Sequence, residues 1–219
     1  MIPITIDEPL RGTVLLAAFQ AEELTARGTS EALEADLAAL RARVAERYPD
    51  PAAAIELLGP ARLLYRALGL DPTKTRPSSE ALIRRLINGR GLYRINRVVD
   101  TCNLCSIDIA LPIGLYDTAR VRWPAVLRRG LEGEGYAGLG KDEVHVAGRY
   151  TLADAEGPFG NPSSDSFRTR ICEETTGCTF VLFAPAGYPR DRLAEHMDRC
   201  AGRMSLYCGG RIAARALVD

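Results

Sequence analysis

Apolar residues follow strand spacing in some parts of the chain and helix spacing in others. Ile2, Ile4 and Ile6 alternate with polar residues, and residues 13–19 form a second apolar run, so both segments are predicted to be strands. Leucines three and four residues apart predict a helix over residues 31–47. Further helices are predicted over 51–68, with an interruption at Gly59-Pro60, over 78–89, with Ser78 or Ser79 as N-cap, and over 190–207.

Short apolar segments dominate the second half of the chain. They predict strands over residues 120–127, 144–146, 150–152, 170–172 and 179–183, with a hairpin around Lys141-Asp142. After the last helix, Gly209-Gly210 leads into a short tail. Consecutive strands with flanking helices argue against a doubly wound parallel sheet, so the predicted fold class is α+β.

The segment from residue 93 to residue 117, YRINRVVDTCNLCSIDIALPIGLYD, combines an apolar helical stripe from Ile95 to Ile109 with a line of polar groups. Asn96, Asp100 and Asn103 share one face of the predicted helix. The sequence LPIG then ends the helix, and the Tyr-Asp pair follows directly. This pattern is typical of a pocket wall, and equally of a core helix whose polar groups bond to a neighbouring loop.

Two glycine-rich stretches have different predicted roles. The stretch 130–140, GLEGEGYAGLG, precedes a hairpin rather than a helix, which favours a turn over a dinucleotide site. The stretch 156–162, EGPFGNP, is a rigid loop followed directly by SSDS. Its amides and hydroxyls could hold a ribose or an amino-acid carbonyl, or the loop could be an ordinary tight connection.

Composition limits the class of protein. The 219 residues include 47% hydrophobic and 26% charged residues, which is enough apolar material for a sizeable core. No apolar run approaches the roughly 18 residues that span a bilayer, and the first residues do not have the pattern of a signal peptide. The expectation is a cytoplasmic protein without a membrane partner.

Charge is balanced overall but unevenly distributed. The formal net charge is zero, so the chain as a whole has no nucleic-acid signature. Residues 81–99 nevertheless contain five arginines and no acid, and a second basic run occupies residues 120–129. Such clusters either bind phosphates or form solvated helix ends and strand faces.

The six cysteines do not form a recognisable metal motif. Cys102 and Cys105 make a single CxxC with no second pair, and the two histidines share no spacing with them. Both cysteines lie on the apolar face of the predicted helix, where a thiol behaves as a small hydrophobe. Buried structural thiols are therefore expected, with no metal and no cofactor. A reactive dithiol is the alternative, although it lacks the usual strand-to-helix setting.

Several motifs together resemble a known family. VVDTCN (98–103) and LPIGLYD (111–117) are similar to the VVDVTN and QPMHAFD pair of the β subunit of bacterial phenylalanyl-tRNA synthetase, in its editing module, B3/B4. Residues 152–184 resemble the second half of that module, so the resemblance covers roughly 64–184. LDPTKTRPSSEAL (70–82) looks closer to free-standing relatives. The resemblance implies an α+β fold with β-sandwich-like sheets and flanking helices. It also implies one B3/B4-like domain over 1–219, with 1–62 as an N-terminal extension and 63–207 as the core.

The resemblance also implies a reaction, the hydrolysis of the ester that joins a wrong amino acid to the terminal adenosine of tRNA. Such an ester is already activated, so the site has mainly to position water and stabilise an oxyanion. A general base would contribute roughly 10²–10⁴-fold. The chain departs from the synthetase pattern at two positions: Gly114 replaces the histidine of QPMHAFD, and Val181 replaces the glutamate of the strand step LLEC.

The residues left to perform this chemistry fall into three groups, with tRNA as the expected partner. The predicted catalytic residues are Asp100, Asn103 and Asp117. The predicted substrate-binding residues are Glu156, Gly157, Gly160, Asn161, Asp165, Thr169 and Arg170. The predicted phosphate-binding residues are Arg76, Arg94 and Arg97. A binding module for tRNA or an amino-acid-like ligand, without chemistry, is a second hypothesis, and a thiol-dependent protein is a third.

Overall fold

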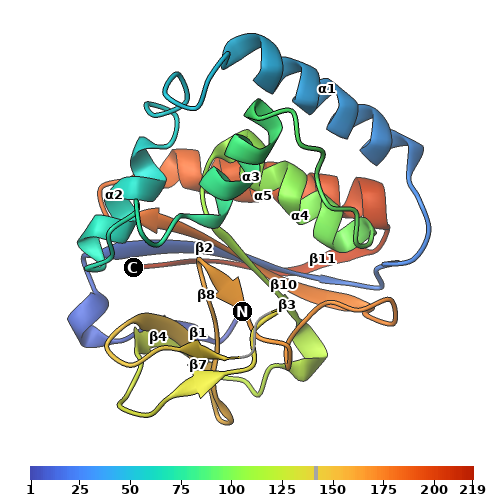
Figure 1. The fold of residues 1–219 in the computed structure, drawn as a ribbon. Coiled ribbons are helices and arrows are strands. Elements are labelled where there is room, and N and C mark those ends of the chain that lie inside the picture. Colours follow the sequence, from blue (N-terminus) through green and yellow to red (C-terminus); the bar gives the residue numbers. More distant parts are fainter. Residues whose placement is uncertain (141–142) are drawn as a thin grey trace.

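A four-stranded antiparallel sheet forms the middle layer of the molecule, between a layer of helices and a second sheet (Figure 1). The structure is a computed structural model that describes residues 1–140 and 143–219. The strand order is β11 (Arg211–Val218), β2 (Val14–Glu22), β10 (Gly177–Pro185) and β3 (Ile113–Asp117). The two central strands, β2 and β10, are buried along nearly their whole length, because both faces of this sheet are covered.

The second sheet has five strands. Its order is β1 (Ile4–Ile6), β4 (Ala125–Arg129), β7 (Tyr150–Asp154), β8 (Gly157–Asn161) and β9 (Ser164–Asp165). The first pair is parallel and the other pairs are antiparallel. A separate ribbon joins β5 (Gly135–Tyr136) and β6 (Val144–His145).

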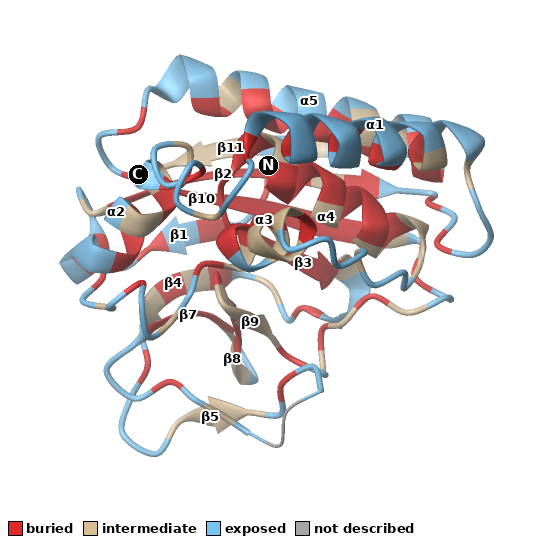
Figure 2. Cartoon of the chain, turned by 45° about the horizontal axis from the view of Figure 1, so that its top comes forward, coloured by how far each residue is buried: buried red, intermediate tan, exposed pale blue. Residues whose placement is uncertain are grey.

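Four helices cover the outer face of the four-stranded sheet: α1 (Glu31–Arg47), α3 (Ser78–Ile87), α4 (Arg97–Ile109) and α5 (Arg190–Cys208). Burial increases from α1, whose outer side is exposed, to α4, which is almost wholly buried (Figure 2). A fifth helix, α2 (Gly59–Ala67), reaches the core between the sheets through Leu64 and Tyr65. Two short 3-10 helices cover Glu8–Leu10 and Thr118–Arg120. Within the described residues, none of the helices is long and apolar enough to cross a membrane.

Strand alternation directs the side chains of β3 to two different cores. Ile113 and Leu115 belong to the core under the helices, whereas Tyr116 belongs to the core between the two sheets. Because successive residues of a strand point to opposite faces, this short strand forms part of both cores. It therefore couples the helical layer to the second sheet, and the candidate site lies at this junction.

The structure confirms the α+β class with layered sheets and flanking helices, and the predicted helix over 31–47 has the observed bounds. The predicted helix from residue 51 is wrong, because residues 51–58 form turns and α2 begins only at Gly59. Pro60 has no N–H to continue a helix from the preceding turn, and it lies instead in the first turn of a new one.

Other predicted bounds also need correction. The N-cap of α3 is Pro77, not Ser78 or Ser79, and this helix ends at Ile87. Helix α4 begins at Arg97, and Asn96 caps it by accepting the N–H of Val99 (3.0 Å) rather than lying on its polar face. Ile95 precedes the helix and is 63% exposed.

Strand predictions failed where local sequence was weak or misleading. Residues 120–124 are not part of a strand, because β4 starts after Pro124, which has no N–H to donate to a ladder. Residues 170–172 are not a strand either, because the N–H of Cys172 donates to Thr175 Oγ1 (3.0 Å) and forms a turn. Strands β3, β8 and β11 were not predicted, since their Pro and Gly residues or terminal position indicated a turn, a loop and a tail. The predicted hairpin around Lys141-Asp142 lies outside the described residues.

The N-terminal 62 residues contribute to both sheets, with β1 in one and β2 in the other. The division into an extension over 1–62 and a core over 63–207 of a single domain stays a proposal.

Candidate functional site

A cavity of about 560 Å³ lies between α4, β3 and the turn that joins β8 to β9. This volume falls within the roughly 300–1,000 Å³ of small-molecule sites in proteins. Its apolar lining includes Val99, Cys102, Ile113, Leu115, Leu139 and Ile171. Its polar lining consists of Ser78, Asn103, Asn161, Ser163, Ser164, Asp165 and Arg170. The cavity thus brings together four of the sequence-predicted site residues: Asn103, Asn161, Asp165 and Arg170.

Asp165 is the acidic residue among those lining the cavity. Its Oδ2 accepts the N–H of Leu115 (3.3 Å), while its Oδ1 is withdrawn from solvent and has no hydrogen-bond partner among the described residues. Burial raises the pKa of Asp165 to about 7, against the opposing effect of the hydrogen bond from the Leu115 N–H. A carboxyl group with this pKa can exchange protons near neutral pH.

Tyr116 lies behind Asp165, in the core between the sheets. Its hydroxyl is buried without a hydrogen-bond partner in the described part of the chain, and burial raises the pKa of this phenol. The ring meets Phe159 edge-on, with centroids 4.9 Å apart. A Cβ atom added at Gly114 would lie 2.2 Å from the hydroxyl oxygen, and one added at Gly160 would lie 2.5 Å from it. The phenol therefore fills the space that side chains at these two positions would need.

The two departures from the synthetase pattern meet in space. Gly114 of β3 pairs directly with Val181 of β10, and Val181 is fully buried in the core between the sheets. Both positions are on the same side of the sheet as Tyr116, because they alternate with Leu115 and with Leu182. The place where the synthetase module has a histidine and a glutamate is thus occupied here by an apolar pair and the Tyr116 phenol.

The turn from β8 to β9 is held by its own hydrogen bonds. Asn161 Oδ1 accepts the N–H groups of Ser163 (2.8 Å) and Ser164 (3.0 Å), and its Nδ2 donates to the Tyr136 hydroxyl (3.2 Å). Tyr136 in turn donates to the carbonyl of Ser164 (2.6 Å). The Ser163 hydroxyl lies 2.7 Å from that of Tyr65. Asn161 therefore fixes the shape of the cavity wall. The backbone N–H groups of Ser163 and Ser164 already have their acceptor in its side chain.

Two predicted catalytic carboxylates do not line the cavity. Asp100 is buried at the start of α4, where it accepts from Arg94 Nε (2.8 Å) and from the N–H of Ile95 (3.1 Å). Asp117 is buried at the end of β3, where it accepts from the Thr175 hydroxyl (2.7 Å). Each carboxylate anchors a turn next to the cavity.

The other four predicted substrate-binding residues do not line the cavity. Glu156 lies on the surface and pairs with Arg122 (2.7 Å), and Gly157 follows it in the same hairpin. Gly160 contacts the Tyr116 ring as described. Thr169 is buried, 2.9 Å from the Ser166 hydroxyl. These residues support the second sheet rather than the cavity surface.

The predicted phosphate-binding arginines are mostly engaged within the protein. Arg94 pairs with Glu34 as well as with Asp100, and these two acids raise its pKa. Arg97 has a buried Nε without a partner in the described chain. Arg76 is about half exposed and lies 3.8 Å from a buried Glu80.

Ser78, Tyr116 and Tyr136 are not among the site residues predicted from the sequence. Ser78 is predicted there only as a possible helix cap, yet its Oγ is buried without a partner in the described residues, and the residue lines the cavity. If LPIGLYD is interpreted as a strand, its period-two spacing places Tyr116 on the same face as Gly114. This spacing is the signal in the sequence that could have identified Tyr116 as a neighbour of the site.

Five of the six thiols are buried, as expected, and Cys172 is half-buried. Burial raises the pKa of Cys102 well above its ordinary value. A thiol in this state is a poor nucleophile, which argues against a dithiol at this CxxC.

Comparison with known proteins agrees with these features. The model of the B3/4 domain family matches residues 61–198, and the chain therefore belongs to the B3/4 domain family. The phenylalanine–tRNA ligase beta subunits of Brucella abortus (strain 2308) and Brucella suis biovar 1 (strain 1330) are each 34% identical over 104 residues. This match covers 47% of this chain and 13% of those subunits, so the chain spans only a small part of their length. The resemblance to the synthetase module is thereby confirmed.

A solved N-terminal fragment of the phenylalanyl-tRNA synthetase beta-subunit from Pyrococcus horikoshii also matches in structure. It aligns with 98% of this chain and 53% of that fragment, at 13% identity and a TM-score of 0.44.

Proposed function

We propose that this protein is a trans-editing hydrolase that deacylates mischarged aminoacyl-tRNA in the cytoplasm. Membership of the B3/4 domain family supports a tRNA-related role. The observation that carries the proposal is Asp165, a half-buried residue on the wall of a 560 Å³ cavity, whose Oδ1 is withdrawn from solvent and whose pKa is raised to about 7.

In the proposed reaction, the Asp165 carboxylate accepts a proton from a water molecule, whose oxygen attacks the carbonyl carbon of the ester. The Asn103 amide, which lines the same cavity, donates a hydrogen bond to the resulting oxyanion. When the carbon–oxygen bond to the ribose breaks, the proton held by Asp165 passes to the leaving ribose oxygen. The products are a free amino acid and tRNA with a free terminal hydroxyl. A base of this kind contributes roughly 10²–10⁴-fold to the rate.

Asp100 and Asp117 remain predicted contributors, with roles that differ from direct base catalysis. Asp100 holds the chain just before α4, next to Ile95 and Val99 of the cavity wall. Asp117 holds the end of the strand that supplies Ile113 and Leu115 to the same wall. Both carboxylates would act by positioning the wall.

A non-catalytic module that binds tRNA or an amino-acid-like ligand is the second candidate. The observation that favours it is the buried pair of Gly114 and Val181, since the synthetase module has a histidine and a glutamate at these positions. This module would retain the cavity and lack the hydrolysis.

The deciding experiment is deacylation of a panel of mischarged tRNAs, including tRNA-Phe charged with tyrosine, by the protein and by Asp165→Asn and Asp100→Ala variants. We expect release faster than the spontaneous rate, reduced about 10²–10⁴-fold in Asp165→Asn while the melting temperature holds. Full activity in Asp165→Asn would exclude this carboxylate as the base. No release, together with salt-sensitive retention of tRNA, would favour the binding module.

A further inference from the structure

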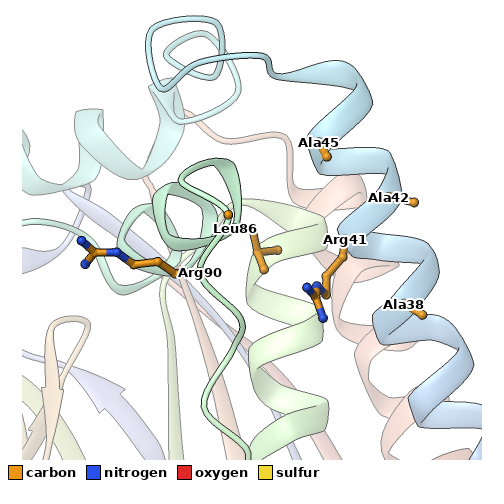
Figure 3. A pocket seen from close by; sticks show the side chains of 7 residues that line it. Ala38, Arg41, Ala42, Ala45, Leu86 and Arg90 are labelled. Atoms are coloured by element: carbon orange, nitrogen blue, oxygen red, sulfur yellow. The ribbon is translucent and has the colours of Figure 1, made fainter.

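A basic groove of about 310 Å³ runs along the outer side of α3. It is lined mainly by Arg76, Arg84, Arg85, Asn88, Arg90 and Tyr93, and we call these residues the arginine groove. A second hollow of about 370 Å³ adjoins it through Arg90 and extends to α1. Figure 3 shows Arg41 of α1 and Arg90 on opposite sides of Leu86 in this second hollow. Guanidinium groups thus follow one another across two adjacent depressions.

The positive charge of the groove is only partly compensated. Glu80 is fully buried and is shared by Arg62 (2.8 Å), Arg84 (2.7 Å) and Arg76 (3.8 Å), so one carboxylate serves three guanidinium groups. Within the described residues, no carboxylate oxygen lies within 4.0 Å of a guanidinium nitrogen of Arg85 or Arg90. A surface with this excess of guanidinium groups attracts polyanions.

An aromatic ring lies within the same surface. Tyr93 is 66% exposed, and the guanidinium carbon of Arg85 lies 3.9 Å from its ring centroid. The arginine holds one side of the ring in place while most of the side chain remains in solvent. An exposed, oriented aromatic ring among cations is the arrangement on which an unpaired nucleobase stacks, with its phosphates on the neighbouring arginines.

The arginine groove and the cavity are lined by neighbouring residues of the chain at two places. Ser78 and Ile95 line the cavity, and Arg76 and Tyr93, two residues before each of them, line the groove. Two residues span at most about 7 Å, so the two depressions lie close together at both places. An extended ligand with its end in the cavity can therefore reach the groove, whereas a small anion cannot occupy both.

We propose that the arginine groove binds the unpaired RNA strand that leads to the ester in the cavity, with a base stacked on Tyr93 and phosphates on Arg85 and Arg90. The inference rests on the proposed function, and it assigns RNA contact to arginines other than Arg94 and Arg97. Arg94 is neutralised by Glu34 and Asp100, whereas neither Arg85 nor Arg90 has a carboxylate partner among the described residues. Arg90 is exposed, and the half-buried Arg85 donates its Nε–H to the Gly91 carbonyl, which leaves its terminal nitrogens available for a phosphate.

The first test compares the double variant Arg85→Gln/Arg90→Gln with a matched control, Arg129→Gln/Arg149→Gln. Both arginines of the control pair are exposed, Arg129 at the end of β4 and Arg149 just before β7 of the far sheet, and the double substitution makes the same change in charge. Binding of uncharged tRNA is measured between 50 and 200 mM salt. On a single strand each lost phosphate contact makes the slope of log K against log salt shallower by about 0.7, so the loss of two contacts should reduce the change in affinity between 50 and 200 mM salt by about sevenfold. An unchanged slope in the groove variant, or an equal loss in the control, would overturn the proposal.

The second test separates stacking from charge. Tyr93→Phe should bind tRNA as the unchanged protein does, and Tyr93→Leu should bind about tenfold more weakly with an unaltered salt slope. Equal binding by the two variants would exclude the stacked base. Polyglutamate and a polyuridine of the same charge are also compared as competitors of tRNA. If polyglutamate competes as effectively as polyuridine, the partner is an acidic protein and not RNA.

A small ester distinguishes failure of this inference from failure of the proposed function. Aminoacyl-adenosine carries the ester without the RNA body, so the Arg85→Gln/Arg90→Gln variant should hydrolyse it at the unchanged rate while it loses activity on aminoacyl-tRNA. If the Arg85→Gln/Arg90→Gln variant hydrolyses aminoacyl-adenosine and aminoacyl-tRNA at unchanged rates, the arginine groove does not bind the RNA, while the proposed hydrolase activity stands. If the unchanged protein hydrolyses neither but the groove variant still shows the lower salt slope, the RNA surface stands and the hydrolase does not.

Discussion

Replacement of Gly114 by alanine tests directly whether the Tyr116 phenol has taken the place of a side chain at this position. The added Cβ would lie 2.2 Å from the hydroxyl oxygen and 2.7 and 2.9 Å from two ring carbons, whereas real Cβ atoms essentially never come closer than 3.0 Å. The ring cannot retreat freely, because Phe159 meets its edge and the Gly160 backbone lies on its other side. Something in the core between the sheets must move.

The expected cost follows from this geometry. Overpacking of a close-packed core costs about 1–3 kcal/mol, and three contacts below 3.0 Å place this substitution at the upper end of that range. For a chain of this size, each kcal/mol lowers the melting temperature by about 2–4 °C. Without the clash, the sign would be reversed, because alanine restricts the unfolded chain more than glycine and stabilises by about 0.4–1 kcal/mol at compatible positions. The sign of the change in the free energy of unfolding therefore decides whether the Tyr116 phenol occupies the space next to Gly114.

The assay is thermal and urea unfolding of Gly114→Ala, Tyr116→Phe and the double variant. Gly202→Ala serves as the control, since an added Cβ in this exposed part of α5 meets nothing within 4 Å and should stabilise the helix. Removing the hydroxyl relieves the shortest contact but not the ring carbons, so Gly114→Ala should cost less in the Tyr116→Phe background without becoming neutral. Equal or higher stability of Gly114→Ala, or an identical cost in both backgrounds, would refute this reasoning.

Three further predictions concern buried groups. The pKa of Asp165 is about 7 in the folded protein against 3.8 as its ordinary value, so the folded state holds the extra proton between about pH 4 and pH 7. In urea titrations across pH, the free energy of unfolding relative to that of Asp165→Asn should therefore fall as pH rises through this window and level off above it. The comparison with the variant removes the opposite contribution of His196, whose pKa is lowered by burial to about 4. Glu80→Gln should lower the free energy of unfolding by about 1–3 kcal/mol in urea, because it leaves the partly buried guanidinium groups of Arg62 and Arg84 without their shared carboxylate. Native alkylation followed by mass spectrometry should label the half-buried Cys172 before the five buried thiols, Cys102 among them, because burial withdraws these thiols from the reagent and raises the pKa of Cys102.

Each of these predictions has an outcome that contradicts it. Stability that rises between pH 4 and pH 7 by an amount lost in Asp165→Asn would mean that Asp165 is stabilised in its charged form. A Glu80→Gln variant as stable as the unchanged protein would mean that the arginines around this carboxylate are already solvated. Rapid labelling of Cys102 under native conditions would restore the hypothesis of a reactive dithiol.

Periodicity predicted the long elements because the spacing of their apolar residues is set by the burial of one face. The helix over residues 31–47 buries Leu33, Leu37, Leu40 and Val44 on one side and presents polar groups on the other, so its sequence alone specifies it. Strand β8, with sequence GPFGN, has no such pattern. It is a strand because β7 and β9 pair with it, and Gly160 is there to admit Tyr116 from the opposite sheet.

The candidate site shows the same division between local and long-range information. Asn103, Asn161, Asp165 and Arg170 were predicted from polar residues in two motifs, and the fold brings these motifs to one cavity. The raised pKa of Asp165 depends on burial beside β3, which no local pattern reveals. Asp100 and Asp117 were selected for their polarity, yet their partners, Arg94 and Thr175, satisfy them within the structure.

The position of β2 between β10 and β11 has a consequence for folding during synthesis on the ribosome. Residues 14–22 pair with residues 177–185 and 211–218, so the first long strand to be made must wait for the last two. At about 5–20 residues per second, the apolar side chains of β2 stay without their strand partners for on the order of ten seconds or more. The middle layer therefore closes only after residues 177–185 and 211–218 have been synthesised, and a nascent chain that stalls before this point would expose β2 to chaperones or to aggregation.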